Sequence, residues 1–195
     1  WSSIDYFGNW KALQYAVQKD YEDVAIVEVY NELNDIDYFL VSDSPKGIKD
    51  SIIYRVIDLT GTILSESKVS CEVNAGKPQK IELGPKDIEL LENSDVVIEF
   101  NFGLNYTRRF DRLSNRTEKA DEMAVIFSLK SSEEEMNTSI LEINTTKFVR
   151  SLWVSSSNSK IKMEQNFISL LPGKHTFIIE HIGELSIDDL KFMWH

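Results

Sequence analysis

Lys68-Val69-Ser70-Cys71-Glu72-Val73 alternates polar and apolar side chains over the length of a β-strand. Successive side chains of an extended chain point to opposite faces, so the three apolar residues would line a core while the three polar ones face water. The stretch therefore predicts a half-buried strand. Cys71 is the only cysteine, which excludes an internal disulfide, and its place in the alternation indicates a buried thiol.

Similar short runs recur along the chain, with turn residues such as Thr60-Gly61 and Pro172-Gly173 between them. We predict further strands at 24–30, 38–41, 51–59, 80–83, 96–102, 123–129, 139–143, 148–154, 176–180 and 190–194. Regularly spaced short strands favour sandwiches over a doubly wound sheet. The sequence thus predicts an all-β fold of two immunoglobulin-like β-sandwich domains, at 21–118 and, smaller, at 119–195, preceded by a short N-terminal helix.

Residues 105–119 interrupt the strand pattern. They are polar and basic, with arginines at positions 108, 109, 112 and 116, and they have no clear period. We interpret them as an irregular connection at a domain boundary. The arginines fit a solvated linker, and an anion site is the alternative.

The first twenty residues have a helical period instead. Trp10, Leu13 and Val17 recur at helical spacing after Asn9, whose side chain is suited to cap a first turn. These residues predict one amphipathic helix over 9–19. A helix this short needs another surface to pack on.

The charge of the chain limits its partners. Thirty-two acidic residues against 21 basic ones give a formal net charge of −11. Such a surface repels the phosphates of nucleic acids and anionic membrane surfaces. No apolar run reaches the roughly 18 residues that a membrane helix needs. We therefore expect no nucleic acid and no membrane among the partners, whereas neutral sugars and other protein faces remain open.

Residues that commonly carry chemistry are few. His175, His181 and His195 lack the spacing of metal ligands, and the chain has no phosphate loop or nucleophile elbow, so we expect no metal and no cofactor. Asn31-Glu32 matches the pair that often carries the acid/base residue of retaining glycosidases. The polar residues that follow, through Asp37, indicate a solvated turn rather than a desolvated pocket that would raise a carboxyl pKa. We assign no catalytic or substrate-binding residue.

Four sequences fit the N-glycosylation pattern, at Asn105, Asn115, Asn137 and Asn144. Several would arise by chance in a chain rich in Asn, Ser and Thr. They matter only in an organism that glycosylates exported proteins.

The opening residues carry a more specific signal. Trp1-Ser2-Ser3-Ile4-Asp5-Tyr6-Phe7-Gly8-Asn9-Trp10-Lys11-Ala12-Leu13-Gln14-Tyr15 resembles the pattern W-S-S-[LIM]-[DE]-Y-x-G-[RK]-W-K-x-L-H-Y of β-mannosidases in glycoside hydrolase family 2. It departs from that pattern at Asn9, usually Arg or Lys, and at Gln14, usually His. Asn166-Phe167-Ile168-Ser169-Leu170-Leu171-Pro172-Gly173 also resembles the family's N-F-F-D-L-L-P-G element.

The resemblance implies a C-terminal fragment. In that family the first pattern lies where the catalytic (β/α)8 barrel ends, and two immunoglobulin-like domains follow. Residues 1–20 would then be the tail of the barrel with its last helix. Family members hydrolyse terminal β-mannose with retention, using two glutamates upstream of this pattern. We therefore expect this fragment not to be an enzyme, although its parent is one.

The partners follow from the same resemblance. They are the parent's catalytic barrel and, through the parent, mannosides; we expect an exported parent, whether periplasmic, secreted or lysosomal. Without the barrel, the face with Trp10, Leu13 and Val17 would be exposed unless it docks on the first sandwich or on a second copy. Burying such side chains stabilises by about 1.5–3 kcal/mol each, so we expect a homodimer of the fragment or a rearranged segment.

Two roles remain open for the sandwiches. The first is structural, bracing the barrel. The second is carbohydrate binding through exposed aromatic platforms, for which Trp153, Tyr38 and Trp194 are the candidates. Their positions within alternating apolar patterns favour core placement and thus the structural role.

Overall fold

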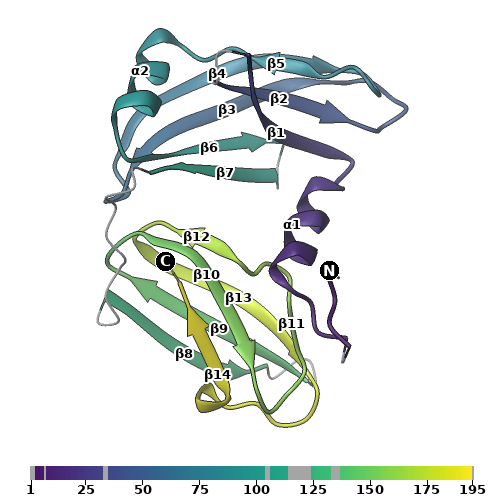
Figure 1. The fold of residues 1–195 in the computed structure, drawn as a ribbon, viewed down its shortest axis with the longest axis vertical. Coiled ribbons are helices and arrows are strands. Elements are labelled where there is room, and N and C mark those ends of the chain that lie inside the picture. The colour runs from purple at the N-terminus through teal and green to yellow at the C-terminus, as the bar shows by residue number, and fades with distance from the viewer. Residues whose placement is uncertain are drawn as a thin grey trace. The chain divides into compact units, whose positions relative to one another are not determined.

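The computed structural model describes residues 3–6, 8–32, 35–103, 106–113, 124–132 and 137–194. These residues divide into two compact units (Figure 1). We call residues 18–113 the first sandwich and residues 124–194 the second sandwich; residues 3–17, the N-terminal segment, belong to the same unit as the second sandwich. Neither α-helix in the described part of the chain has the length and apolarity needed to cross a membrane.

Two antiparallel sheets form the first sandwich. Its strands are β1 (Val24–Tyr30), β2 (Ile36–Ser42), β3 (Ile48–Asp58), β4 (Ile63–Val73), β5 (Gln79–Ile81), β6 (Val96–Phe102) and β7 (Tyr106–Arg112). One sheet has the order β1-β2-β5 and the other β4-β3-β6-β7 (Figure 1). The chain changes sheet after β2, after β4 and after β5, as in immunoglobulin-like domains. The all-β, immunoglobulin-like fold predicted from the alternation is confirmed.

Aromatic side chains from both sheets fill the core of the first sandwich. Tyr38 from β2 and Tyr54 from β3 are almost fully buried, and their ring centroids lie 4.9 and 6.0 Å from that of Phe100 on β6. Phe110 on β7 contacts Tyr38 and Phe100. Cys71 lies in the same core, as its alternation indicated, and burial raises the pKa of its thiol. The two sheets are thus joined by rigid rings of large area.

Strand β7 corrects the sequence analysis. Residues 106–112 are not an irregular connection but a regular strand paired with β6. The strand pattern is hard to recognise because Arg108 and Arg112 are in phase with apolar Phe110 and occupy positions where apolar residues would be expected. Each has an acidic partner, since Arg108 lies 2.9 Å from Asp20 and Arg112 pairs with Glu28. Pairing makes these charges tolerable at partly buried positions.

The other face of the same sheet carries a rung of alternating charge. Glu66, Arg55, Glu99 and Arg109 are cross-strand neighbours on β4, β3, β6 and β7. Arg55 Nε lies 2.6 Å from the Glu66 carboxylate, and Arg109 Nη2 lies 2.6 Å from that of Glu99. Burial alone would raise the pKa of Glu99, but hydrogen bonds from Asn101 and Arg109 hold it below its ordinary value. Opposite charges in register favour this strand order.

Helix α2 (Pro85–Asn93) connects β5 to β6 and was not predicted from the sequence. Gly84 precedes it, and Pro85 has the fixed φ that suits a first helical position. Asp87 in its first turn is buried. The hydroxyl of Tyr54 donates to Asp87 Oδ2 at 2.7 Å and accepts from the Gly84 N–H at 3.1 Å. These two bonds tie α2 to the core.

The second sandwich also has two antiparallel sheets. Its strands are β8 (Val125–Ser131), β9 (Thr138–Thr145), β10 (Val149–Ser156), β11 (Ile161–Met163), β12 (Ile168–Leu170), β13 (Gly173–His181) and β14 (Leu190–Met193). One sheet has the order β11-β13-β9-β8 and the other β12-β10-β14. A 3₁₀ turn, Ile187–Asp189, precedes β14. Strands β11 and β12 were not predicted, because three residues are too few for an alternation to be recognised.

The core of the second sandwich is mainly aliphatic. Leu141, Ile143, Leu152 and Ile179 are almost fully buried in it, and Trp194 closes one side. The strands predicted at 139–143, 148–154 and 176–180 therefore supply inward residues of this core.

The N-terminal segment begins with a tight hairpin. The Asp5 carboxylate accepts hydrogen bonds from the backbone N–H and the side-chain amide of Asn9, and Ile4 pairs with Trp10. Helix α1 (Ala12–Asp20) follows. The predicted start and cap at Asn9 are wrong, because residues 4–10 form the hairpin, in which Asn9 donates to Asp5, and the helix begins only at Ala12.

The buried face of α1 also differs from the prediction. Tyr15 is only 5% exposed, whereas Leu13 is 56% exposed. Tyr15 packs against Trp153 of the second sandwich, with ring centroids 5.9 Å apart. Tyr15 thus packs on the second sandwich, which was not among the expected partners, while Asp20 at the end of the helix pairs with Arg108 of the first sandwich. Tyr15 is buried instead of Leu13 because its ring packs on Trp153 while its hydroxyl accepts from a backbone N–H.

We predict that removing the Tyr54 hydroxyl lowers the unfolding free energy of the first sandwich. In Tyr54→Phe, buried Asp87 and the Gly84 N–H would both lose a partner, so the first sandwich should lose about 1–3 kcal/mol of unfolding free energy. The control is Tyr30→Phe, because Tyr30 is 61% exposed on β1.

Urea unfolding measures the effect. All four tryptophans lie outside residues 18–117, so tryptophan fluorescence serves as an internal reference for the other unit, and circular dichroism reports both. Equal unfolding curves for Tyr54→Phe and Tyr30→Phe would contradict the role given to this hydroxyl.

Candidate functional site

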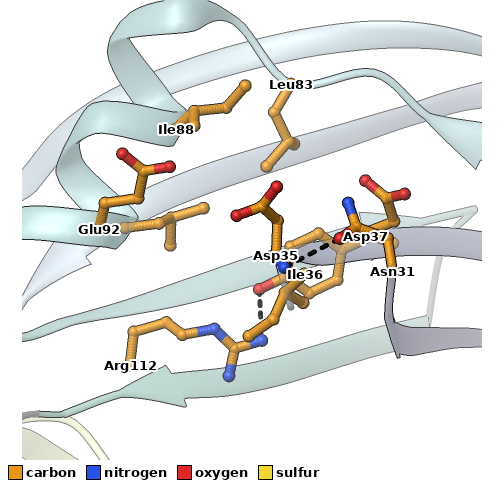
Figure 2. A pocket seen from close by; sticks show the side chains of 10 residues that line it. Asn31, Asp35, Ile36, Asp37, Leu83, Ile88, Glu92 and Arg112 are labelled. Carbon is orange, nitrogen blue, oxygen red and sulfur yellow. Dashed lines mark hydrogen bonds between the residues drawn. The ribbon is translucent and has the colours of Figure 1, made fainter. Parts of the chain in front are cut away.

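A hollow of about 370 Å³ opens in the first sandwich where β2 begins, β7 ends and α2 lies. Figure 2 shows Ile88 and Glu92 reaching it from α2 and Arg112 from the end of β7. The remaining lining residues are Asn31, Asp35, Ile36, Asp37, Tyr38, Leu83 and Leu91. The hollow thus combines an apolar side with carboxylates, an amide and a guanidinium.

Arg112 is the fixed element of this hollow. Its Nη2 donates to the Tyr38 hydroxyl at 2.7 Å and pairs with the Glu28 carboxylate. Its guanidinium also lies 5.6 Å from the centre of the Tyr38 ring. Burial opposes the charge of Arg112, but its bonds to Glu28 and Tyr38 more than offset this and raise its pKa above the ordinary value. The guanidinium is therefore held charged and oriented.

The acidic side chains of the hollow differ in their pairing. Asp37 lies 2.9 Å from the ammonium of Lys80. The backbone N–H of Asp35 donates to Asn31 Oδ1 at 2.9 Å, which closes the turn between β1 and β2 (Figure 2). Glu92 comes from the exposed side of α2. The hollow thus offers several carboxylate and amide oxygens as hydrogen-bond acceptors and one guanidinium as a donor. Such a set suits the hydroxyls of a neutral ligand better than an anion.

The three aromatic candidates for sugar platforms are each buried or in contact with another ring. Tyr38 is 1% exposed and Trp194 is 8% exposed, each within a core. Trp153 points away from the core of the second sandwich, but Tyr15 packs edge-on against its ring. Tyr38 and Trp194 therefore offer no open ring face for a sugar, and Tyr15 occupies one side of Trp153. For Trp153 the predicted core placement is wrong.

The other residues singled out in the sequence are dispersed. Glu32 lies on an exposed turn after β1. His175 contacts the Leu171 carbonyl oxygen at 2.8 Å, and His181 contacts Ser139 Oγ at 3.0 Å, so both have local structural partners. Within the described residues, no three His, Cys, Asp or Glu side chains gather in a way that could hold a metal ion. His195 and Arg116 lie outside the described residues.

Two of the glycosylation sequences fall within the described residues. Asn137, before β9, and Asn144, on β9, are both exposed. Asn105 and Asn115 lie outside the described residues. Exposure leaves both asparagines sterically open to modification.

Sequence reasoning found Asn31 and Asp37 as members of a turn but not as walls of a hollow. Arg112 was interpreted as part of a linker, and Glu92 lies on the unpredicted helix α2. The signal that was available is the phase of Arg112 with Phe110, which places its side chain on the core side of β7.

Comparison with known proteins places the fold. No protein-family model matches the chain, and no curated protein matches its sequence. A β-D-mannosidase from Dictyoglomus thermophilum matches 100% of this chain with a TM-score of 0.68 at 18% identity, over 24% of its own length. Two structures of an exo-chitosanase from Amycolatopsis orientalis, in complex with PNP-β-D-glucosamine, match 100% of it with TM-scores of 0.56 and 0.57 at 12% and 11% identity, over 28% of their length.

These matches have two consequences. At such identities they establish the fold, and at that level the resemblance to a β-mannosidase indicated by the opening residues is confirmed. The chain also spans only 24–28% of the length of the solved chains that it matches.

Tyr38 predicts a pH dependence of stability. Burial raises its pKa from 10.0 to about 12. In the unfolded chain this hydroxyl would ionise near pH 10, whereas in the folded chain it stays protonated. Its contribution is therefore complete below about pH 10 and is lost as the pH rises towards 12, by about 2–3 kcal/mol in total.

The measurement compares unfolding free energies of the wild type and Tyr38→Phe across this range. The difference between them should fall with rising pH, while Tyr30→Phe should follow the wild type. Parallel pH profiles for wild type and Tyr38→Phe would show that the hydroxyl is not protected by burial.

Proposed function

We propose that this chain is the non-catalytic C-terminal accessory region of a β-mannosidase, and that its sandwiches support the catalytic barrel of the parent structurally. The parent hydrolyses terminal β-mannose residues with retention. The observation that carries this proposal is a match of the whole chain to the fold of a β-mannosidase that is about four times as long. A part that fits so completely within a larger enzyme is most simply one of its regions.

The opening residues support the same proposal independently. They resemble the segment that ends the barrel in this family, and the reactive glutamates of the family lie before it. The N-terminal hairpin and α1 form an ordered structure with defined contacts, as a barrel tail would. The reactive carboxylates would then be supplied by the preceding part of the parent, which we propose to be exported. The homodimer expected for the isolated fragment stays a prediction.

The alternative is a carbohydrate-binding module. The aromatic residues do not favour it, because Tyr38 and Trp194 are buried and Trp153 is engaged by Tyr15. The hollow beside Arg112 does, because it offers hydrogen-bonding groups next to apolar side chains. We prefer the structural role, since sugar sites usually add an aromatic face to such groups, and the ring in this hollow, Tyr38, is 1% exposed.

Catalysis by the fragment is tested with a chromogenic β-mannoside. The 195-residue chain should release no product above the uncatalysed rate, whereas the parent should turn over at roughly 1–1,000 s⁻¹, as enzymes commonly do. The control is the parent with both barrel glutamates replaced by glutamine. Release of mannose by the fragment, or a parent gene that encodes no barrel, would overturn the proposal.

Sugar binding is tested by calorimetry with manno-oligosaccharides. We expect no heat, because a structural support has no need for a sugar site. Binding that disappears in Glu92→Gln but persists in Glu89→Gln, a change on the same helix outside the lining of the hollow, would instead favour the alternative.

A further inference from the structure

The aromatic cluster beneath α1 is not used by the hollow in the first sandwich. It begins with Trp10, which the hairpin of the N-terminal segment holds in place. The Ile4–Trp10 bridge and the bonds from Asn9 to Asp5 fix the turn, and the Lys11 N–H donates to the Ser3 carbonyl oxygen at 2.9 Å. Trp10 is therefore presented by a rigid support rather than by a loose end.

Tyr15 occupies the centre of the cluster. Its ring lies edge-on to Trp10 and to Trp153, with centroid distances of 5.3 and 5.9 Å. Its hydroxyl accepts from the backbone N–H of Met163 on β11 at 3.4 Å, a contact between residues 148 positions apart. With 5% of its surface exposed, Tyr15 is the only residue of α1 that is fully buried in the described part of the chain.

The second sandwich supplies a matching surface. Trp153 alternates with core residues Leu152 and Val154 and so faces outwards from β10. The ammonium of Lys162 on β11 lies 5.1 Å from the centre of the Trp10 ring, in range of a cation–π attraction. We call Trp153, Lys162 and the Met163 backbone the docking surface of the second sandwich. Lys162 places its ammonium beside the Trp10 ring. Trp153 packs against the ring of Tyr15, and the Met163 N–H donates to the Tyr15 hydroxyl.

Gly8 shows how closely the two parts approach. Its φ is +82°, which favours glycine, and a Cβ added there would lie 2.8 Å from Lys160 Nζ. Gly8 of the hairpin thus lies beside the Lys160 side chain of the second sandwich, in a backbone conformation that favours glycine.

We propose that the second sandwich anchors the end of the catalytic barrel, by holding Trp10 of the hairpin and Tyr15 of the last barrel helix on its docking surface. This inference rests on the proposed function for the identity of the barrel, but the contact itself lies within this chain. It makes the second sandwich, although it comes last in the sequence, a direct clamp on the barrel tail. The clamp joins two segments of the chain that are separated in the sequence by the first sandwich.

Hydrogen exchange of the 195-residue chain tests the clamp. Trp153→Ala removes one wall of the Tyr15 site, so amide exchange in residues 12–17 should accelerate by roughly tenfold or more, because local opening controls exchange. Trp153→Phe keeps a ring and should restore most of the protection. Leu13→Ala is the matched control, since Leu13 lies on the same helix but is 56% exposed.

The outcomes separate folding from docking. Core amides of β9 and β13 should keep their protection in Trp153→Ala, because Trp153 lies outside the core that these strands build. Unchanged exchange of residues 12–17 in Trp153→Ala would overturn the proposal. So would equal acceleration by Leu13→Ala.

The parent enzyme provides the second arm. In the full-length protein, Trp153→Ala should shorten the half-life of mannosidase activity on heating, while the initial rate stays that of the wild type. Ile178→Ala, an exposed position on β13, is the control. If the parent hydrolyses no mannoside, the proposed function fails and the exchange experiment still decides the clamp; if only the half-lives are equal, the clamp does not act on the barrel.

Discussion

Buried tyrosines govern this structure, because each ring brings a hydroxyl into the interior that must find a partner. In the first sandwich, Tyr38 and Tyr54 join both sheets through Phe100. Their hydroxyls then determine what surrounds the core. Tyr54 holds Asp87 and the start of α2, and Tyr38 accepts from Arg112. The two walls of the hollow, the helix and the guanidinium, are thus positioned by the polar ends of core residues.

The same requirement explains how the N-terminal segment is attached. Tyr15 finds two aromatic rings for its apolar part and a backbone N–H for its hydroxyl, all within the second sandwich and its segment. An aliphatic residue would need only the apolar part of such a site. In a β-mannosidase, a joint of this kind would fix the angle between barrel tail and sandwich as well as their distance, because ring edges and a hydrogen bond are directional.

Strands with a clear alternation could be predicted from the sequence, together with their inward residues, as the core positions of Cys71 and Val73 illustrate. Strand β7 could not, because Arg108 and Arg112 take positions that a local pattern reserves for apolar residues. Their partners, Asp20 and Glu28, lie more than 80 positions away in the sequence. The start of α1 was missed because Asn9 and Trp10 belong to the hairpin that Asp5 closes, so the helical spacing from Trp10 was misleading. The hollow required α2, whose few apolar residues do not distinguish it from a loop.

The charged side chains that include Glu66 and Arg109 also affect the two outer strands of their sheet. In the described part of the chain, β4 and β7 are the outer strands of their sheet, and open strand edges can pair with those of another molecule. Strand β7 carries three arginines, whose ion pairs and hydration would be disturbed by a close pairing with another edge. Strand β4 carries Glu66, Lys68 and Glu72, whose hydration would be lost in a close pairing. Charged outer strands of this kind resist edge-to-edge aggregation while a chain is still being synthesised and folded.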